Sequence, residues 1–346
     1  QKKQPDKQED AKRICGDSGL MKLDNKLSEL VSTYSVKPAL NQLNDGPWFI
    51  TDDKHREYKN EKQDARAEDL GKYYKEKSVD KDYGFTDIQI ANQKSLMKTV
   101  TLAMIDELVD KDEDITFFSE GDTYVFENER TNETVYADEN LNVLQVIKSP
   151  TCNCNPNHSG CKYPLPDYVT LFDAVCSQIQ EDVCVMQQNG KDMASNNLAA
   201  VHVCLPSHWK PADKIGEDFA TIHGKVPGMG KMKHDKIWSA CVNKGPYERF
   251  NWTLTDSPIL NQHPDKNIGK DFDSDDLYLR IERQVLKGFP TVQGLLFMIR
   301  TFVINIDELN KEQKNSIINS IEEMNADELI YKGLSEKIKY NNVISL

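Results

Sequence analysis

The stretch from Val201 to Pro227 reads VHVCLPSHWKPADKIGEDFATIHGKVP, and it predicts a strand, a rigid turn and a short helix in succession. The apolar run at its start, residues 199–205, has β-branched side chains two apart, which is typical of a buried strand. Pro206 ends this strand because proline cannot donate to a β-ladder. After the turn, residues 217–222 carry apolar side chains at helical spacing.

His223 directly follows this short helix, and Gly224 is a typical helix terminator. The backbone would hold an imidazole at such a place, which suits a ligand of a metal or of haem iron. A core histidine with satisfied hydrogen bonds fits the same pattern. The residues alone leave both interpretations of His223 open.

The composition argues against nucleic-acid binding and against a membrane span. Among 346 residues there are 43 Lys and Arg and 56 Asp and Glu, which gives a net charge of −13. The most basic segment, residues 225–236, is short and mixed with Gly and Met, whereas phosphate binding requires a concentrated basic face. The longest apolar run, Leu295 to Ile299, is far shorter than the roughly twenty residues of a membrane helix. We expect a soluble protein of one large domain or two ordinary ones.

The eight cysteines allow two interpretations. Three of them crowd into the loop TCNCNPNHSGCKYPLP at 151–166, and together with His158 they have the ligand types of a zinc site. Their spacing differs from that of paired C-x-x-C knuckles, so disulfides in an oxidising compartment fit better. The cysteines are Cys15, Cys152, Cys154, Cys161, Cys176, Cys184, Cys204 and Cys241.

Three sequons, at Asn132, Asn157 and Asn251, are consistent with secretion. The sequence begins at Gln1 without a methionine or an apolar leader, as a processed secreted protein would. We therefore expect a secreted or ER-lumenal glycoprotein with disulfide bonds, and keep a cytoplasmic location as the alternative.

Hydrophobic periodicity predicts mainly helices in the first half of the chain and strands in the second. Helices are expected over 21–43, 54–77, 88–109 and 168–187, of which 54–77 is so polar that we expect a solvated helix. A hairpin at 123–137 and a strand at 143–147 interrupt them. Strands are expected over 199–205, 247–254, 277–285 and 294–306, and helical segments over 309–334. This order predicts an α+β fold with an antiparallel sheet.

Charged residues inside the later strands mark a candidate site. Alternation puts Arg249 on one face of its strand, with Asn251 and Thr253, while Arg280 and Glu282 share a face of the next strand. Arg300 is the one charge within 294–306. Because buried charges need partners, these residues either form an internal salt-bridge lattice or face a ligand, and the sequence pattern does not decide between the two.

Six segments, in this order, resemble the signatures of the haem-dependent oxidative N-demethylase alpha-subunit family. They are EDVCVM at 181–186, VCLPSHWKPADKIG at 203–216, IHGKVP at 222–227, RFNWTL at 249–254, LRIERQVLKGFP at 279–290 and LLFMIRTF at 295–302. The resemblance implies one domain over 47–306, with the hairpin and the cysteine-rich loop, about 120–165, as an insertion. Residues 1–46 would be an N-terminal tail and helix, and residues 307–346 a C-terminal helical extension.

The resemblance implies a PAS-like antiparallel sheet with flanking helices, whose concave face holds a b-type haem. It also implies an axial histidine for the iron, which would be His223, with His202 and His208 as competitors. Arg249, Arg280 and Glu282 would have the catalytic roles of polarising bound dioxygen and orienting an amine. The remaining cofactor-binding residues would be Lys214, Trp252 and Arg300.

The activity implied by the resemblance is O2-dependent dealkylation of a small amine. The sequence has no recognisable flavin or iron–sulfur segment, so electrons would come from partner subunits, as in the family. Lys225 stands where the family more often has proline. The alternative function is that of a non-catalytic secreted protein that binds haem for sensing or for structure and is stabilised by disulfides.

Overall fold

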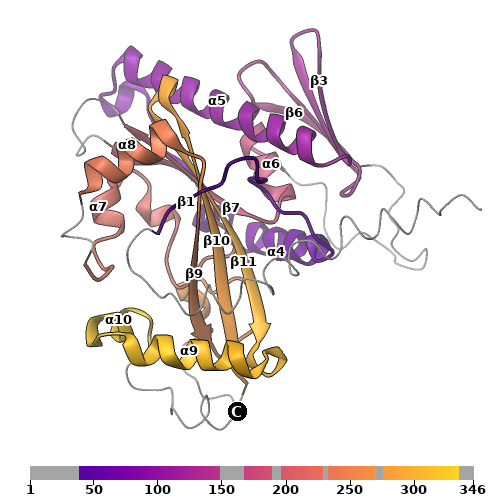
Figure 1. Cartoon of the computed structure of the whole chain (residues 1–346). Helices are drawn as coiled ribbons and strands as arrows, with labels where there is room; N and C mark the ends of the chain where they lie inside the picture. The colour runs from indigo at the N-terminus through magenta and orange to yellow at the C-terminus, as the bar shows by residue number, and fades with distance from the viewer. Residues whose placement is uncertain (1–38, 149–166, 189–195, 229–232, 270–275, 335–346) are drawn as a thin grey trace, which may run out of the picture.

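The computed structural model describes residues 39–148, 167–188, 196–228, 233–269 and 276–334. Over these residues the chain has the predicted α+β fold, with two antiparallel sheets and helices packed against them (Figure 1). In the described part of the chain, no helix combines the length and the apolar character needed to cross a bilayer.

A seven-stranded antiparallel sheet runs through the centre of the molecule (Figure 1). Its longest strands, β10 (Tyr278–Phe289) and β11 (Gly294–Asn305), form a hairpin paired from Tyr278–Asn305 to Phe289–Gly294. The other strands are β1 (Asn41–Gln42), β2 (Tyr74–Glu76), β7 (Asp182–Gln188), β8 (Asn196–His202) and β9 (Tyr247–Thr255). The order across the sheet is β1-β9-β10-β11-β7-β8-β2.

The register gathers the predicted polar residues on one face of this sheet. Directly paired residues of an antiparallel ladder point to the same side. On β10 the polar row is Arg280, Glu282 and Gln284, and its register partners on β9 are Thr253, Asn251 and Arg249. We call the side that carries this row the polar face.

The opposite face of the sheet packs on two helices, α5 (Asp87–Lys111) and α6 (Leu171–Gln178). Helix α5 confirms the predicted helix at 88–109, and it begins with a capping box between Thr86 and Gln89. Its apolar stripe is buried against Val183 and Val185 of β7 and Leu296 and Met298 of β11. This is the largest hydrophobic core in the described part of the chain, and it leaves the polar face free for a site.

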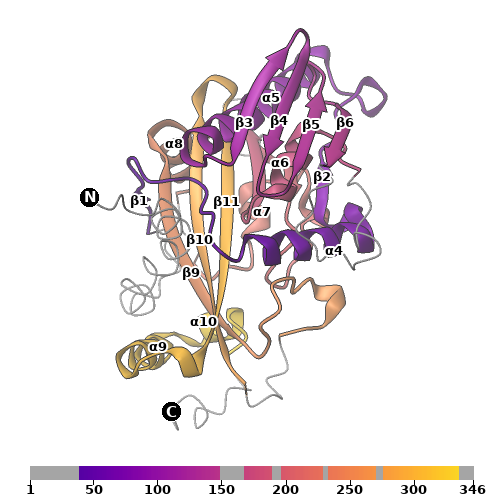
Figure 2. The same cartoon turned by 90° about the vertical axis from the view of Figure 1, so that its right-hand side faces the viewer.

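A second, four-stranded sheet extends this core. Its strands are β3 (Ile115–Glu120), β4 (Thr123–Asn128), β5 (Glu133–Ala137) and β6 (Val143–Lys148), in sequence order. Strands β4 and β5 are the predicted hairpin, β6 is the predicted third strand, and β3 is an addition that the sequence pattern did not predict. Phe126 and Val135 join the core under α5, and Figure 2 shows this sheet beside α5 and α6.

Helix α4 (His55–Tyr73) confirms the helix predicted over 54–77, but the expectation that this helix is solvated was wrong for one of its faces. Lys62 is fully buried, and its Nζ donates to the carbonyl oxygen of Cys176 at 2.9 Å and to that of Glu181. Lys59 is also buried and forms an ion pair with Glu133 of β5. Polar residues of this helix are therefore interior, because groups far away in the sequence supply their partners.

The predicted helix at 168–187 is correct only in its first half. After α6 ends at Gln178, the chain turns and forms strand β7, which is buried over nearly its whole length. A continuous apolar run does not distinguish a buried strand from a buried helix by spacing alone. The helix predicted within 21–43, which Pro38 is expected to end, lies outside the described residues, and residues 41–42 after that proline form β1.

Two short helices, α7 (Phe219–Ile222) and α8 (His234–Lys244), pack on the polar face. Two more, α9 (Lys311–Glu323) and α10 (Ala326–Tyr331), lie at the lower end of the long strands in Figure 1. On α9, Ile317 and Ile321 pack with Leu279, Ile281 and Phe302 of the sheet. The predicted C-terminal extension therefore packs on the preceding strands and forms one hydrophobic core with them.

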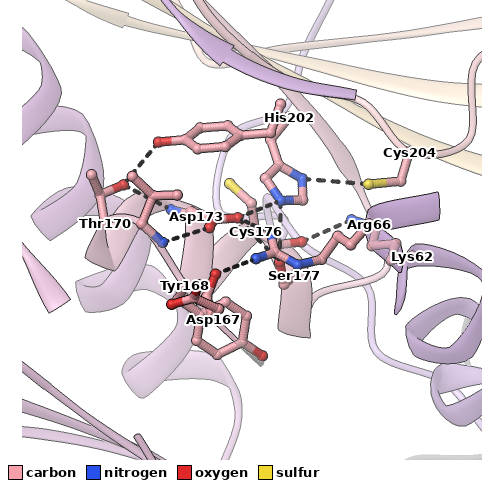
Figure 3. A network of polar contacts seen from close by, with 12 residues as sticks. Lys62, Arg66, Asp167, Tyr168, Thr170, Asp173, Cys176, Ser177, His202 and Cys204 are labelled. Carbon is pink, nitrogen blue, oxygen red and sulfur yellow. Dashed lines mark hydrogen bonds and ion pairs between the residues drawn. The ribbon is translucent and has the colours of Figure 1, made fainter. Parts of the chain in front are cut away.

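A buried polar network ties α4 and α6 to β8 (Figure 3). Asp173 lies at its centre: its Oδ1 is 3.1 Å from His202 Nε2 and also forms an ion pair with Arg66. Ser177 Oγ is 3.1 Å from the same His202 nitrogen. In a nucleophilic triad the serine and the aspartate contact different ring nitrogens, and here all three side chains are almost inaccessible to solvent. We therefore interpret this cluster as structural.

We expect the stability of the fold to fall in mild acid because of His202. Burial lowers the pKa of its imidazole from 6.5 to about 4. In the unfolded chain this group takes up a proton as the pH falls through 6.5, whereas in the folded chain it stays neutral down to about 4. The free energy of unfolding should therefore drop by about 3 kcal/mol between pH 6.5 and 4 on account of this residue.

Urea denaturation of the wild type and of His202→Gln at both pH values measures this effect. The variant should be less stable at pH 7 but should lose clearly less stability on acidification. Burial also lowers the pKa of His55 to about 4, so part of the wild-type loss will remain in the variant. Equal pH dependence in the two proteins would contradict the assignment to His202.

Candidate functional site

A cavity of about 1520 Å³ lies between the polar face of the large sheet and the segments that cover it. Helices α7 and α8 border it at one end, and α10 borders it at the other. Ligand pockets for molecules of drug size usually have about 300–1,000 Å³, so this one has room for a large cofactor together with a small second ligand. Its apolar wall includes Met186, Leu198, Trp209, Phe219, Trp238, Leu295 and Phe297.

His223 lines this cavity at the end of α7. The helix begins at Asp218, whose carboxylate caps it by accepting from the backbone N–H of Thr221. At the other end, His223 Nδ1 is 2.8 Å from the carbonyl oxygen of Phe219, and the two rings lie 4.2 Å apart. A carbonyl oxygen only accepts, so Nδ1 carries the proton and Nε2 keeps its lone pair.

Electrostatics keep this imidazole neutral. Burial lowers the pKa of His223, and the nearby charge of Arg249 lowers it further. The hydrogen bond to Phe219 acts in the opposite direction but does not outweigh burial. A neutral imidazole with one nitrogen bonded to the backbone is the form in which histidine binds a metal.

The polar row on β10 is oriented by a serine from the segment after β8. Ser207 Oγ accepts from Arg280 Nε at 2.7 Å and donates to Glu282 Oε1, also at 2.7 Å. The second carboxylate oxygen of Glu282 accepts from Gln284 Nε2 at 2.9 Å. Arg280, Glu282 and Gln284 all line the cavity, so one hydroxyl group positions both a cation and an anion at its wall.

Lys332 is a cavity residue that the sequence pattern did not indicate. It follows α10, and its Nζ donates to Asn251 Oδ1 at 2.8 Å and to the carbonyl oxygen of Trp252. Burial lowers the pKa of its ammonium group to about 7, an effect that Glu282 opposes and Arg249 reinforces. Since α10 was predicted only as a polar helix, no local signal could have shown that this lysine reaches the polar face.

Six of the seven predicted site residues border the cavity: His223, Lys214, Arg249, Arg280, Glu282 and Trp252. By its register with Ile281, the Trp252 side chain lies on the face of β9 opposite to the polar row. Lys214 lies at a partly exposed place and pairs with Glu217 at 3.0 Å. Arg300 is the exception. It points to the opposite face of the sheet, where it is fully buried and pairs with Asp52 at 2.6 Å.

The two histidines that compete with His223 as iron ligand lie in different parts of the structure. His208 lines the cavity, in a left-handed backbone conformation with φ of 61°. His202 does not line it, and its ring is bound into the structural network around Asp173. His223 and His208 are thus the histidines of the described cavity wall.

The cysteines and sequons within the described residues give no support to the secreted alternative. Cys176, Cys184, Cys204 and Cys241 are buried free thiols. Asn251 belongs to a sequon, but its amide oxygen accepts a hydrogen bond from Lys332 at the cavity. The possible zinc or disulfide cluster of Cys152, Cys154 and Cys161, and the sequon at Asn157, lie outside the described residues.

Comparison with known protein families matches residues 39–340 to a model described as haem-dependent oxidative N-demethylase, alpha subunit-like. The chain belongs to this family. The match extends beyond the predicted boundaries at 47 and 306, and it includes the small sheet and the C-terminal helices. The family resemblance inferred from the six sequence segments is therefore confirmed.

The cavity of this family member fits a haem. It presents a neutral histidine with a lone pair on Nε2, an apolar wall rich in aromatic rings, and cationic side chains. One of these cations, Arg280, is 1% exposed, and its Nη1 is without a hydrogen-bond partner among the described residues. A haem requires an axial ligand, apolar contacts for the macrocycle and partners for its carboxylates, and each has a counterpart here.

Proposed function

We propose that this chain binds haem b through His223 and acts in the O2-dependent N-demethylation of a small amine. His223 carries the proposal, because its Nδ1 is fixed by the Phe219 carbonyl and its Nε2 is left to bind iron at the wall of a large cavity. The family description supports haem as the cofactor.

Bound haem would supply the redox chemistry by which dioxygen oxidises an N-methyl group. The side chains of the polar face would bind and orient the other reactants. Glu282, held by Ser207 and Gln284, offers a fixed negative charge that attracts a protonated amine. Arg249 offers N–H donors from the neighbouring strand. The apolar wall would keep water away from both.

We further propose that electrons reach the site from another subunit. The family is described as alpha subunit-like, which supports an assembly with other chains. The sequence itself has no recognisable flavin or iron–sulfur segment that would accept electrons from a nicotinamide donor. The chain by itself should therefore bind haem without turning over with NADH or NADPH.

Replacement of His223 tests the haem assignment. Purified wild type reconstituted with haem should show a Soret band, and His223→Ala should lose it or show the shifted band of a weakly held haem. His208→Ala is the matched control, since it removes another histidine from the same wall, and it should keep the wild-type spectrum. If His223→Ala kept the spectrum and His208→Ala lost it, the ligand would be His208.

A further inference from the structure

Arg280 has one nitrogen for which the described protein provides no acceptor. Its Nε donates to Ser207 Oγ at 2.7 Å, and its Nη2 donates to the carbonyl oxygen of Leu205 at 2.8 Å. Its Nη1 is buried and has no partner among the described residues. A buried guanidinium N–H without an acceptor is costly. Because Arg280 lines the cavity, a ligand bound there is a source for the missing acceptor.

The acidic and phenolic groups near Arg280 are already engaged. Glu282 uses one oxygen for Ser207 and the other for Gln284. Asp182 uses its two oxygens for the backbone N–H groups of Cys204 and Leu205, each at 2.9 Å. Tyr58 donates to the carbonyl oxygen of Thr301. These are the groups whose charge acts on the Arg280 guanidinium, and none of them is hydrogen-bonded to Nη1.

The charge of the cavity wall is opposite to that of the chain. Five cationic side chains line it (Lys210, Lys214, Lys225, Arg249 and Arg280), besides Lys332 with its lowered pKa, and three acidic ones (Asp213, Glu282 and Asp327), although the whole chain has a net charge of −13. A local excess of positive charge in a wall of low dielectric favours an anionic ligand. The planar fork of arginine is best matched by a carboxylate.

We propose that Arg280 forms a carboxylate-binding subsite of this cavity, with Ser207 as the residue that positions its guanidinium. This proposal rests on the proposed function, because that function identifies the ligands that could bring a carboxylate into the cavity. Two sources supply the same chemistry: a propionate of the porphyrin, or the carboxylate of an N-methylated amino acid bound as substrate. In the second case the enzyme would prefer a zwitterionic amine to a simple one.

Metal-free protoporphyrin IX and its dimethyl ester test the first source without involving iron ligation. Trp209, Trp238 and Trp252 line the cavity, so quenching of tryptophan fluorescence reports binding. A charge-assisted hydrogen bond is worth roughly ten- to hundredfold in affinity, and the wild type should prefer the acid to the ester by that factor. Arg280→Gln should abolish the preference. Ser207→Ala, which keeps the charge, should reduce it, and Ser207→Thr should restore it.

Arg283→Gln is the matched control for Arg280→Gln. Arg283 lies on the same strand but on the opposite face, where Glu248 and the carbonyl oxygens of Pro47 and Trp48 satisfy its guanidinium. This variant should keep the preference for the acid in its folded fraction. A loss of preference in both variants would assign the effect to the fold and overturn the proposal.

Binding of N,N-dimethylglycine and of dimethylamine to haem-loaded protein tests the second source, measured by calorimetry. If the substrate supplies the carboxylate, the wild type should bind dimethylglycine at least tenfold more tightly, and Arg280→Gln should lose that difference. The proposal is overturned if Arg280→Gln matches the wild type in both the porphyrin and the amine experiments. A wild-type porphyrin preference together with an unchanged spectrum of His223→Ala would instead contradict the iron ligand and leave the subsite intact.

Discussion

Gly288→Ala is expected to lower the free energy of unfolding by about 3 kcal/mol or more. A Cβ at this position of β10 would lie well under 3.0 Å from the carbonyl oxygens of Val242 and Cys241, in the last turn of α8. Neither neighbour moves easily, because both are backbone atoms, and Gly288 itself is paired with Leu295 of β11. Helix α8 would have to leave the sheet, and it carries Trp238 of the cavity wall. Urea denaturation measures the loss, and fluorescence quenching should show weaker porphyrin binding.

Gly294→Ala provides the control on the neighbouring strand. The new Cβ would also come closer than 3.0 Å to an atom, but that atom is Cδ1 of Leu96, the end of a flexible side chain. A change of the Leu96 rotamer relieves much of that contact, so the loss should be about half as large or less, and porphyrin binding should not change. If the two substitutions cost the same, close backbone packing of α8 on β10 would not be what requires glycine at 288.

The long strands β9, β10 and β11 and their polar rows were predictable because alternation is a local property. The run LYLRIERQV already separates Arg280 and Glu282 from their neighbours, and the structure keeps this separation. The register between strands is not local. The β10–β11 hairpin pairs Arg283 with Arg300 and Arg280 with Val303, so Arg300 falls on the face opposite to Arg280. The register depends on where the turn between β10 and β11 begins and ends. The sequence pattern did not define that turn, so it could not predict that these two arginines lie on opposite faces of the sheet.

Long-range partners explain the other failures. The polar composition of α4 is typical of an exposed helix, yet Lys59 pairs with Glu133, which lies 74 residues away. Lys332 reaches Asn251 across 81 residues. Periodicity describes the spacing of apolar and polar residues along one helix or strand. It contains no information about which distant group will pair with a charged side chain. The position of His223 at the end of a short helix was predictable because its neighbours, the helical segment and Gly224, fix it locally.

The ion pair between Arg300 and Asp52 is the site of the second large expected effect. Both side chains are at most 1% exposed, with Arg300 Nη2 at 2.6 Å from Asp52 Oδ2. Asp52 Oδ1 accepts from Gln180 Nε2 at 2.8 Å, and the Arg300 guanidinium stacks on the ring of Tyr58. Arg300→Met would leave a buried carboxylate without its cation. We therefore expect a loss of about 3–5 kcal/mol in the free energy of unfolding.

The double variant Asp52→Leu/Arg300→Met removes both charges and should recover a large part of that loss, since replacing a buried pair is far less costly than breaking it. Denaturation of the two single variants and the double variant completes the cycle. Haem content per folded molecule distinguishes the two roles considered for Arg300. A structural role on the opposite face leaves the haem content of the folded double variant unchanged. Loss of haem from that variant would instead return Arg300 to the cofactor-binding residues, as the family resemblance implied.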